Sequence, residues 1–285
     1  MKMVLPNFIG IGVQRAATTW LYNCLSEHPQ VFMPPEKEIH YFDIHFEKGV
    51  DWYASHFSGN TGEIAIGEIT PNYFHADGGI ERMARFNPRA KLIIIFREPC
   101  ERTYSAYKLL HEQFAGKSFR QACSESKYLT RLSCYADKLE ELYSFYPVEN
   151  IKIFLYDDVK NSPYKLIKDI YSFLNVDQEY MPLAIERIYN KIIFPNTQWL
   201  VRKFGLSFFL EYVKKTKFSD FIRDKYEYKK IKSTRSKDES IFRMGMINRQ
   251  SNDDLEYLNE LKSFFREDVL KLQTLINRDL SSWLV

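Results

Sequence analysis

The stretch FIGIGVQRAATTW, from Phe8 to Trp20, holds the pattern that decides the fold. Its first part, Phe8 to Val13, is a continuous apolar run of the kind that forms a strand buried on both faces of a parallel sheet. From Thr18 to Leu25 the apolar residues recur with helical spacing instead. The stretch therefore predicts a strand, a short loop and a helix.

Two further apolar runs repeat this organisation. KLIIIF (Lys91–Phe96) is followed by a polar turn and by a helix whose first residue is expected at Pro99. IKIFLY (Ile151–Tyr156) is followed by helical spacing over Pro163–Leu174. Strands that alternate with helices indicate a parallel sheet. We therefore expect an α/β protein, a P-loop-like three-layer sandwich with a central parallel sheet flanked by helices.

No repeat, low-complexity tract or Gly/Ser linker divides the 285 residues, so a single domain over residues 1–285 is expected. The segment 190–242 does not fit the strand–helix pattern, and we expect it to be a variable insertion that covers the substrate. From Asp253 onward an amphipathic helix is expected to pack on the core. Its apolar side would comprise Leu255, Leu258, Leu261, Phe264 and Phe265.

The overall charge and the apolar runs exclude some classes of protein. Forty basic and thirty-seven acidic residues give a net charge of +3, which is too nearly balanced to predict a nucleic-acid partner. No run of about eighteen apolar residues occurs, so no membrane span is expected. The four cysteines form no CxxC pair and are expected to be reduced thiols. The expected compartment is therefore the cytoplasm, and the oligomeric state is left open.

The loop GVQRAATT (Gly12–Thr19) is a candidate phosphate site. It lies where a strand ends and a helix begins, and free N–H groups and the helix dipole favour an anion there. A nucleoside-triphosphate P-loop reads GxxxxGK[ST], but Ala17 and Thr18 stand in place of its second Gly and its Lys. The cation of this loop is Arg15. The alternative is an ordinary turn with Thr residues that cap the helix.

A second candidate site is REPCERTYSAY (Arg97–Tyr107), directly after the strand Lys91–Phe96. Arg97 is expected at the carboxyl end of that strand, where open parallel sheets usually bind ligands. Ser105 is expected two turns into the following helix. We expect this pocket to be separate from the first one. The alternative is that Arg97 and Arg102 are solvated charges at a helix start.

Together the two motifs resemble those of the sulfotransferase family, whose donor is 3'-phosphoadenosine 5'-phosphosulfate (PAPS). The family's 5'-phosphosulfate loop reads basic-x-Gly-Thr-Thr and then an apolar residue, usually with Lys as the basic residue. The resemblance implies that Arg15 neutralises the bridging oxygen of the leaving group. It also implies that Thr18 and Thr19 bind the 5'-phosphate. The matching donor residues here are Arg15, Ala16, Ala17, Thr18, Thr19 and Trp20.

The RxPxxRxxSxY pattern resembles the family's 3'-phosphate motif, which implies that Arg97 and Ser105 hold that phosphate. A late Arg-x-Gly segment of the family is similar to FRMG (Phe242–Gly245), which adds Arg243 and Gly245 to the expected donor ligands. Sulfuryl transfer needs in-line geometry and stabilised charge on the leaving oxygens. PAPS as donor, 3'-phosphoadenosine 5'-phosphate as product and no metal ion are therefore expected.

The acceptor side is suggested by KEIHYFD (Lys37–Asp43), which resembles a block of Golgi carbohydrate sulfotransferases. The resemblance implies Glu38 as general base and His40 as its assistant. In an extended segment, residues two apart point to the same side, so both side chains are expected on one wall. GEITPNYF (Gly67–Phe74) resembles the stretch that follows the block in those relatives, and Glu68 is the reserve base.

One residue departs from the heparan-type relatives, which carry Lys where Ile69 stands. Either Arg15 alone then supplies the positive charge, or a basic residue from the insertion does so. The basic run 214–237 in that insertion either attracts an anionic acceptor or is a solvated helix face. The expected C-terminal match, Asn277–Leu284, is similar to bacterial members.

The resulting expectation is an enzyme that transfers a sulfuryl group from PAPS to an acceptor hydroxyl or amine. A carbohydrate or glycolipid acceptor is favoured, while small alcohols, phenols and carrier-bound hydroxyl groups remain open. A P-loop small-molecule kinase and a non-catalytic nucleotide-binding protein are the alternative functions. Six aromatic residues near the acceptor block either stack on sugar rings or form core; they are Tyr41, Phe42, Trp52, Tyr53, Tyr73 and Phe74.

Overall fold

The structure, a computed structural model, describes residues 3–110, 112–114, 116–187 and 252–285. Residues 1–190 and 256–285 form one compact unit, and residues 191–255 form a second. The predictions for the insertion 190–242, for its basic run 214–237, and for Arg243 and Gly245 therefore lie outside the described residues. The single-domain boundary stays a prediction.

A five-stranded parallel sheet lies at the centre of the described part of the chain. Its order is β2-β3-β1-β4-β5. The strands are β1 (Phe8–Gly12), β2 (Val31–Phe32), β3 (Ala65–Ile69), β4 (Lys91–Phe96) and β5 (Ile151–Leu155). The predicted parallel sheet is confirmed.

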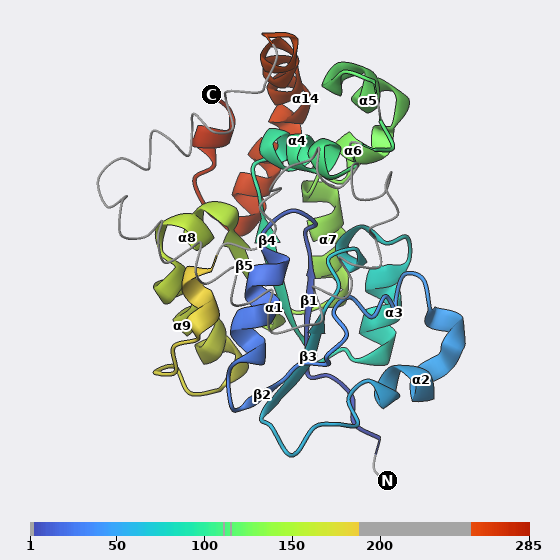
Figure 1. Ribbon diagram of the computed structural model, residues 1–285, viewed down its shortest axis with the longest axis vertical. Helices are drawn as coiled ribbons and strands as arrows, with labels where there is room; N and C mark the ends of the chain where they lie inside the picture. The colour runs from blue at the N-terminus through green and yellow to red at the C-terminus, as the bar shows by residue number, and fades with distance from the viewer. Residues whose placement is uncertain (1–2, 111, 115, 188–251) are drawn as a thin grey trace, which may run out of the picture. The chain divides into compact units, whose positions relative to one another are not determined.

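Helices cover both faces of this sheet. Figure 1 shows α1 and α9 on one face and α3 and α7 on the other. The hydroxyl of Tyr171 in α9 donates to the backbone oxygen of Cys24 in α1 over 3.3 Å, which ties two helices of one face together. The described helices are α1 (Thr18–Ser26), α2 (Gly49–Ser55), α3 (Gly79–Phe86), α4 (Pro99–Leu109), α5 (Phe119–Glu125), α6 (Lys127–Arg131), α7 (Ala136–Phe145), α8 (Tyr156–Asn161), α9 (Pro163–Leu174) and α14 (Asn252–Ile276). The three layers of the predicted sandwich are therefore present.

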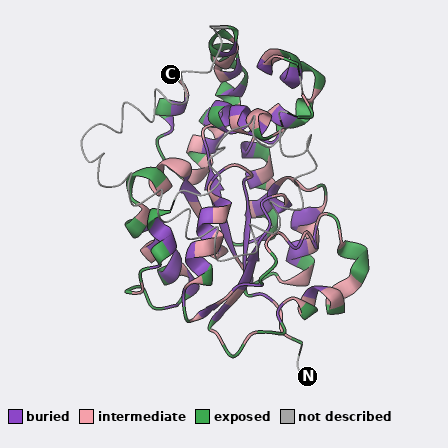
Figure 2. Cartoon of the chain, viewed as in Figure 1, coloured by how far each residue is buried: buried purple, intermediate pink, exposed green. Residues whose placement is uncertain are grey.

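The central strands are buried because helices cover both of their faces. All five residues of β1 are buried, and Leu92 to Phe96 of β4 are at most 1% exposed. Figure 2 shows this buried centre in purple. At Gly10 of β1 a Cβ atom would lie 2.7 Å from the side chain of Ile69, so a glycine is required where β1 and β3 approach.

Five of the six aromatic residues near the acceptor block belong to the core. Tyr41 is 3% exposed, and Phe42, Tyr53, Tyr73 and Phe74 are 0% exposed. The hypothesis that these five stack on sugar rings is therefore wrong. The sixth, Trp52, is partly exposed, and the ammonium group of Lys48 lies 4.2 Å from its ring centroid.

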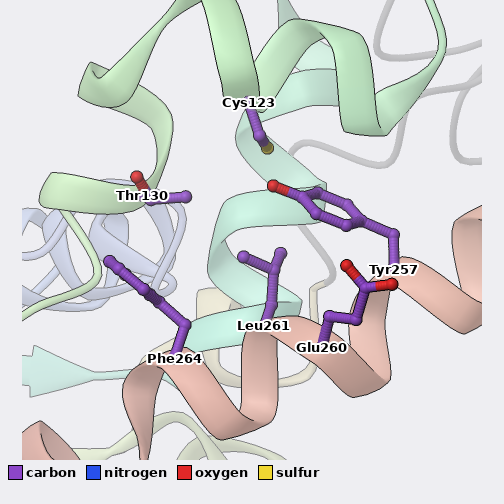
Figure 3. Close-up of a pocket in the computed structure, with 6 residues that line it drawn as sticks. All are labelled: Cys123, Thr130, Tyr257, Glu260, Leu261 and Phe264. Carbon is purple, nitrogen blue, oxygen red and sulfur yellow. The ribbon is translucent and has the colours of Figure 1, made fainter.

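The apolar face of α14 differs from the predicted one. Leu261 and Phe265 are buried, but Phe264 is 61% exposed. The predicted apolar positions 255, 258, 261 and 264 are three residues apart. Because an α-helix has 3.6 residues per turn, positions at this spacing gradually rotate away from the face that packs on the core. The buried stripe continues instead through Val269 and Leu272. A hollow of about 320 Å³ lies beside Phe264. Figure 3 shows the six residues that line it, none of which is a predicted site residue: Cys123, Thr130, Tyr257, Glu260, Leu261 and Phe264.

Candidate functional site

The predicted donor and acceptor motifs meet at the carboxyl edge of the sheet. The loop after β1 contains Arg15, Arg97 follows β4, and Thr70 follows β3. These are the three adjacent central strands. After β1 the chain forms β2 and β3 on one side of β1 and then crosses to β4 on its other side. Such a switch point is where open α/β sheets bind ligands. The topology therefore places the motifs at one ligand-binding edge.

The donor loop has an unusual backbone. Arg15 and Ala17 have φ angles of 71° and 63°, in the left-handed region that favours glycine. Ala17 precedes α1 and provides no side-chain cap. The first N–H groups of an α-helix have no partners within the helix. Ala17 therefore does not cap the positive end of α1, which faces the loop where the sequence predicts an anion site.

The side chain of Trp20 has a structural role. It is 5% exposed, and its Nε1 donates to the backbone oxygen of Ile185 over 3.1 Å. Ala16 is 0% exposed. The predicted contributions of these two residues to the donor are therefore limited to their backbones, because their side chains lie in the core.

We expect Ala17→Gly to stabilise the protein. In the folded state, a φ of 63° destabilises an alanine by roughly 1–2 kcal/mol relative to a glycine. A glycine also gives the unfolded chain more conformational freedom, which offsets about 0.4–1 kcal/mol of this gain. The free energy of unfolding should rise by about 1 kcal/mol, measured by urea denaturation. Ala16→Gly is the control, because Ala16 is buried and lacks a positive φ. Destabilisation of both variants alike would contradict the assignment of strain to Ala17.

The two predicted phosphate motifs interlock. The Nε of Arg15 donates to the hydroxyl oxygen of Ser105 over 3.0 Å, and a terminal nitrogen of Arg97 donates to the backbone oxygen of Arg15 over 3.0 Å. Each arginine thus contacts the motif of the other. The two motifs are thus in contact, because the side chain of Arg15 is long enough to reach α4; the separate binding of the two anionic groups stays a prediction.

Arg97 is held on several sides. It is 6% exposed, and its Nε and NH2 both donate to the Oε2 of Glu101 over 3.1 Å. Its guanidinium lies 4.4 Å from the ring centroid of Tyr156, a cation–π distance.

Arg102 is also buried: it is 0% exposed and donates to the hydroxyl oxygen of Ser133 over 2.5 Å. The alternative interpretation of both arginines as solvated charges is therefore wrong.

The positive charges of Arg15 and Arg97 act on each other. The pKa of Arg15 is lowered, chiefly by burial and then by the charge of Arg97, while Tyr156 acts in the opposite direction. Two close guanidinium groups repel each other, and an anion bound between them would relieve this repulsion. The arrangement is suited to phosphate, whose oxygens match the planar fork of arginine.

On the acceptor side, Glu38, His40 and Asp43 form a chain of contacts. The Nδ1 of His40 lies 2.8 Å from the Oδ2 of Asp43, and its Nε2 lies 3.7 Å from the Oε2 of Glu38. A carboxylate only accepts hydrogen bonds, so the Nδ1–H of His40 donates to Asp43. Lys37 also contacts Glu38. The imidazole is thus oriented by Asp43 with its other nitrogen directed towards Glu38.

The backbone conformation that brings Glu38 and His40 together differs from the predicted one. Their φ angles are 65° and 57°, so the segment is not extended. Left-handed residues bend the chain sharply, and this bend brings the two side chains together. The predicted proximity is present, but the assumption of an extended segment is wrong.

Glu68, the reserve base, lies beneath this segment. It is 1% exposed and accepts hydrogen bonds from the hydroxyl groups of Tyr53, Tyr73 and Thr70 over 2.8, 2.8 and 2.7 Å. Burial raises its pKa, while these hydrogen bonds act in the opposite direction. No acceptor can reach a carboxylate enclosed in this way. Ile69 has no charge, so that position offers the site no cation.

Several functional candidates were missed at the level of sequence. Asp43 lies three residues after His40, in a turn. Glu101, in α4, lies four residues after Arg97, which precedes that helix. Tyr156 follows β5 at the same edge of the sheet. Gln14 of the donor loop donates through its amide to the Oδ1 of Asn72, which links the loop to the turn after β3.

Among the residues that the structure describes, no three His, Cys, Asp or Glu side chains are grouped as a metal ion would need. Nor does any helix in this part of the chain combine the length and apolar character needed to cross a membrane.

The chain is similar in sequence to known proteins. The sulfotransferase domain family model matches residues 5–206. The membrane-associated sulfotransferase kil1 of Dictyostelium discoideum is 40% identical over 108 residues, 37% of this chain and 23% of the relative. The heparan sulfate glucosamine 3-O-sulfotransferase 5 of Mus musculus is 30% identical over 187 residues, 60% of this chain and 54% of the relative. The chain thus spans about half, or less, of these two curated relatives.

The fold also has a match among solved structures. A sulfotransferase from Alicyclobacillus acidocaldarius superposes with a TM-score of 0.69, at 24% identity, over 98% of this chain and 99% of that one. At this level of identity the match bears on the fold, and it supports the three-layer α/β architecture described above.

Proposed function

Because the chain belongs to the sulfotransferase domain family, we propose that it is an enzyme that transfers a sulfuryl group from PAPS to an acceptor hydroxyl or amine. The observation that carries the proposal is the hydrogen-bonded cluster of Arg15, Arg97 and Ser105 at the carboxyl edge of the sheet. Glu38 and His40 lie in a loop that contacts the same edge, since the backbone N–H of His40 donates to the hydroxyl of Thr70 over 3.4 Å.

The proposed reaction is an in-line displacement. The acceptor oxygen attacks sulfur as Glu38 takes its proton, and the bond from sulfur to the 5'-phosphate oxygen breaks. The product nucleotide, 3'-phosphoadenosine 5'-phosphate, leaves with the bonding electrons, and Arg15 neutralises the charge on its oxygen. Arg97 and Ser105 hold the 3'-phosphate. The proposal assigns no role to a metal ion.

We propose a carbohydrate hydroxyl as the acceptor. Support comes from the KEIHYFD block (Lys37–Asp43) and from the name of the mouse relative, a heparan sulfate glucosamine 3-O-sulfotransferase. A transfer assay with labelled PAPS against pooled sugars, lipids and phenols tests donor and acceptor together. Transfer from ATP in place of PAPS would favour the kinase alternative, which the replacement of the P-loop Lys by Thr18 disfavours. Binding of the product nucleotide without any transfer would favour a non-catalytic protein.

Arg97→Ala tests which phosphate this residue holds. We expect the variant to bind 3'-phosphoadenosine 5'-phosphate roughly 10- to 100-fold more weakly, because a charge-assisted hydrogen bond contributes about 1.5–3 kcal/mol. Binding of adenosine 5'-phosphate, which lacks the 3'-phosphate, should change much less. Titration calorimetry measures the dissociation constants of both nucleotides. Arg85→Ala is the control, since its side chain is 79% exposed on α3. An equal loss for both nucleotides would show that Arg97 does not select the 3'-phosphate.

A further inference from the structure

The loop that contains Glu38 and His40 is anchored by its backbone. The N–H groups of residues 39–41 donate to Glu68 or to hydroxyl groups that are bonded to Glu68. The N–H of Ile39 donates to the carboxylate of Glu68 itself. The N–H of His40 donates to the hydroxyl of Thr70 over 3.4 Å, and the N–H of Tyr41 donates to the hydroxyl of Tyr73 over 2.8 Å. Both hydroxyls in turn donate to Glu68. The loop backbone is therefore fixed, directly or through one hydroxyl, to a single buried carboxylate.

A carboxylate in this position is costly unless it is fully bonded. Glu68 is 1% exposed, and removal of an ionised carboxylate from water is unfavourable without hydrogen-bond donors. Its two oxygens accept hydrogen bonds from Tyr53, Tyr73, Thr70 and the backbone of Ile39. A valine or leucine would fill the same space without this cost but would leave these polar groups without an acceptor. The carboxylate therefore organises the polar groups around it.

The loop needs such an anchor because its backbone is strained. Glu38 and His40 both have positive φ angles, which non-glycine residues keep only when surrounding structure enforces them. The side chains between and after them, Ile39 and Tyr41, are 2% and 3% exposed and point into the core. The ring of Tyr41 stacks on that of Tyr53 at 4.4 Å between centroids. With both neighbours buried and their N–H groups fixed, Glu38 and His40 are directed outwards together.

We propose that Glu68 is a positioning residue, which holds Glu38 and His40 in reactive geometry through the hydroxyls of Thr70 and Tyr73. The inference rests on the proposed function, because it takes Glu38 as the base of sulfuryl transfer. A positioning role agrees with the burial of Glu68, whereas the predicted role of reserve base does not. Displacement of a reacting group by about 1 Å can lower a rate 10²-fold, so an anchor of this kind affects turnover strongly.

Two tyrosines allow a matched comparison. Tyr53 and Tyr73 are both 0% exposed, and each hydroxyl donates to the same oxygen of Glu68 over 2.8 Å. Only the hydroxyl of Tyr73, of these two, accepts the backbone N–H of Tyr41. Tyr53→Phe and Tyr73→Phe therefore remove the same buried hydrogen bond to Glu68. They differ in whether the loop backbone loses its partner.

The experiment measures kcat for PAPS-dependent transfer and the dissociation constant of 3'-phosphoadenosine 5'-phosphate in both variants and in Glu68→Gln. We expect Tyr73→Phe and Glu68→Gln to lower kcat roughly 10- to 100-fold, with nucleotide binding within about twofold of the parent protein. Tyr53→Phe should lose much less of kcat. Amide hydrogen exchange at residues 39–41 should be faster in Tyr73→Phe than in Tyr53→Phe. Thr70→Val serves as the second loop variant if Tyr73→Phe fails to fold.

The outcomes separate the two proposals. Equal losses of kcat in the two tyrosine variants, with equal exchange at residues 39–41, would overturn the positioning role and leave Glu68 a purely structural group. An absence of transfer by the parent protein would instead overturn the proposed function. The exchange comparison would then still decide whether Glu68 anchors the loop.

Discussion

Glu38→Gln should lower kcat by roughly 10²- to 10⁴-fold, the range that positioned general bases contribute. The attacking acceptor hydroxyl must lose its proton, and a glutamine of the same shape cannot take it. Glu38 faces the Nε2 of His40 at 3.7 Å, and its side chain is 38% exposed, so an acceptor can reach it. Binding of 3'-phosphoadenosine 5'-phosphate should stay within about twofold, because Glu38 contacts none of the predicted phosphate ligands. Initial rates with saturating PAPS give kcat, and calorimetry gives the binding constant.

Glu36→Gln is the matched control for this substitution. Glu36 lies two residues earlier, its side chain is 68% exposed, and it pairs with His56 at 3.4 Å rather than with His40. The same loss of charge at this position should leave kcat close to that of the parent protein. If Glu38→Gln kept more than about a third of the parent kcat, the base would have to be sought elsewhere, with His40 as the first candidate.

The fold was predictable where one physical signal acted alone. β1, β4 and β5 are continuous apolar runs, and α9 begins and ends at the residues that its spacing predicts, Pro163 and Leu174. β2 and β3 were not foreseen. β2 has two residues, and β3 (AIGEI) contains a glycine and the charged Glu68, which oppose a strand assignment from sequence. β3 forms by pairing with β1, and β2 forms by pairing with β3; both are tertiary contacts that local patterns do not contain.

The site, like the fold, has features that the sequence predicts and features that depend on tertiary structure. Resemblance to family motifs suggested Arg15, Arg97, Ser105, Glu38 and His40. Contacts link these residues at one edge of the sheet. The resemblance could not indicate that Glu38 and His40 have positive φ angles, because neither residue type favours that region. Nor could it distinguish a buried carboxylate from an exposed one at position 68. That distinction depends on Tyr53 and Tyr73, which reach Glu68 from other elements of the chain.

Arg15→Ala should lower kcat by about 10²- to 10³-fold, the usual effect of removing one group that stabilises a developing oxyanion. Charge accumulates on the bridging oxygen as the bond to sulfur breaks, and Arg15 is the cation of the donor loop. Ile69 is buried at the position where heparan-type relatives carry Lys, so that cation is absent here. Binding of 3'-phosphoadenosine 5'-phosphate should weaken only several-fold, because Arg97 and Ser105 keep the 3'-phosphate. A single-turnover assay isolates the chemical step.

Arg15→Lys distinguishes charge from shape. A lysine retains the charge but loses the planar fork that donates to Ser105 over 3.0 Å. We expect it to recover most of the rate lost in Arg15→Ala, since neutralisation of the leaving oxygen depends first on charge. Recovery by Lys together with a large loss in Ala would assign the leaving-group charge to position 15. Unchanged turnover in Arg15→Ala would instead require a cation from elsewhere in the chain, and the basic run 214–237 would be the place to test by charge reversal.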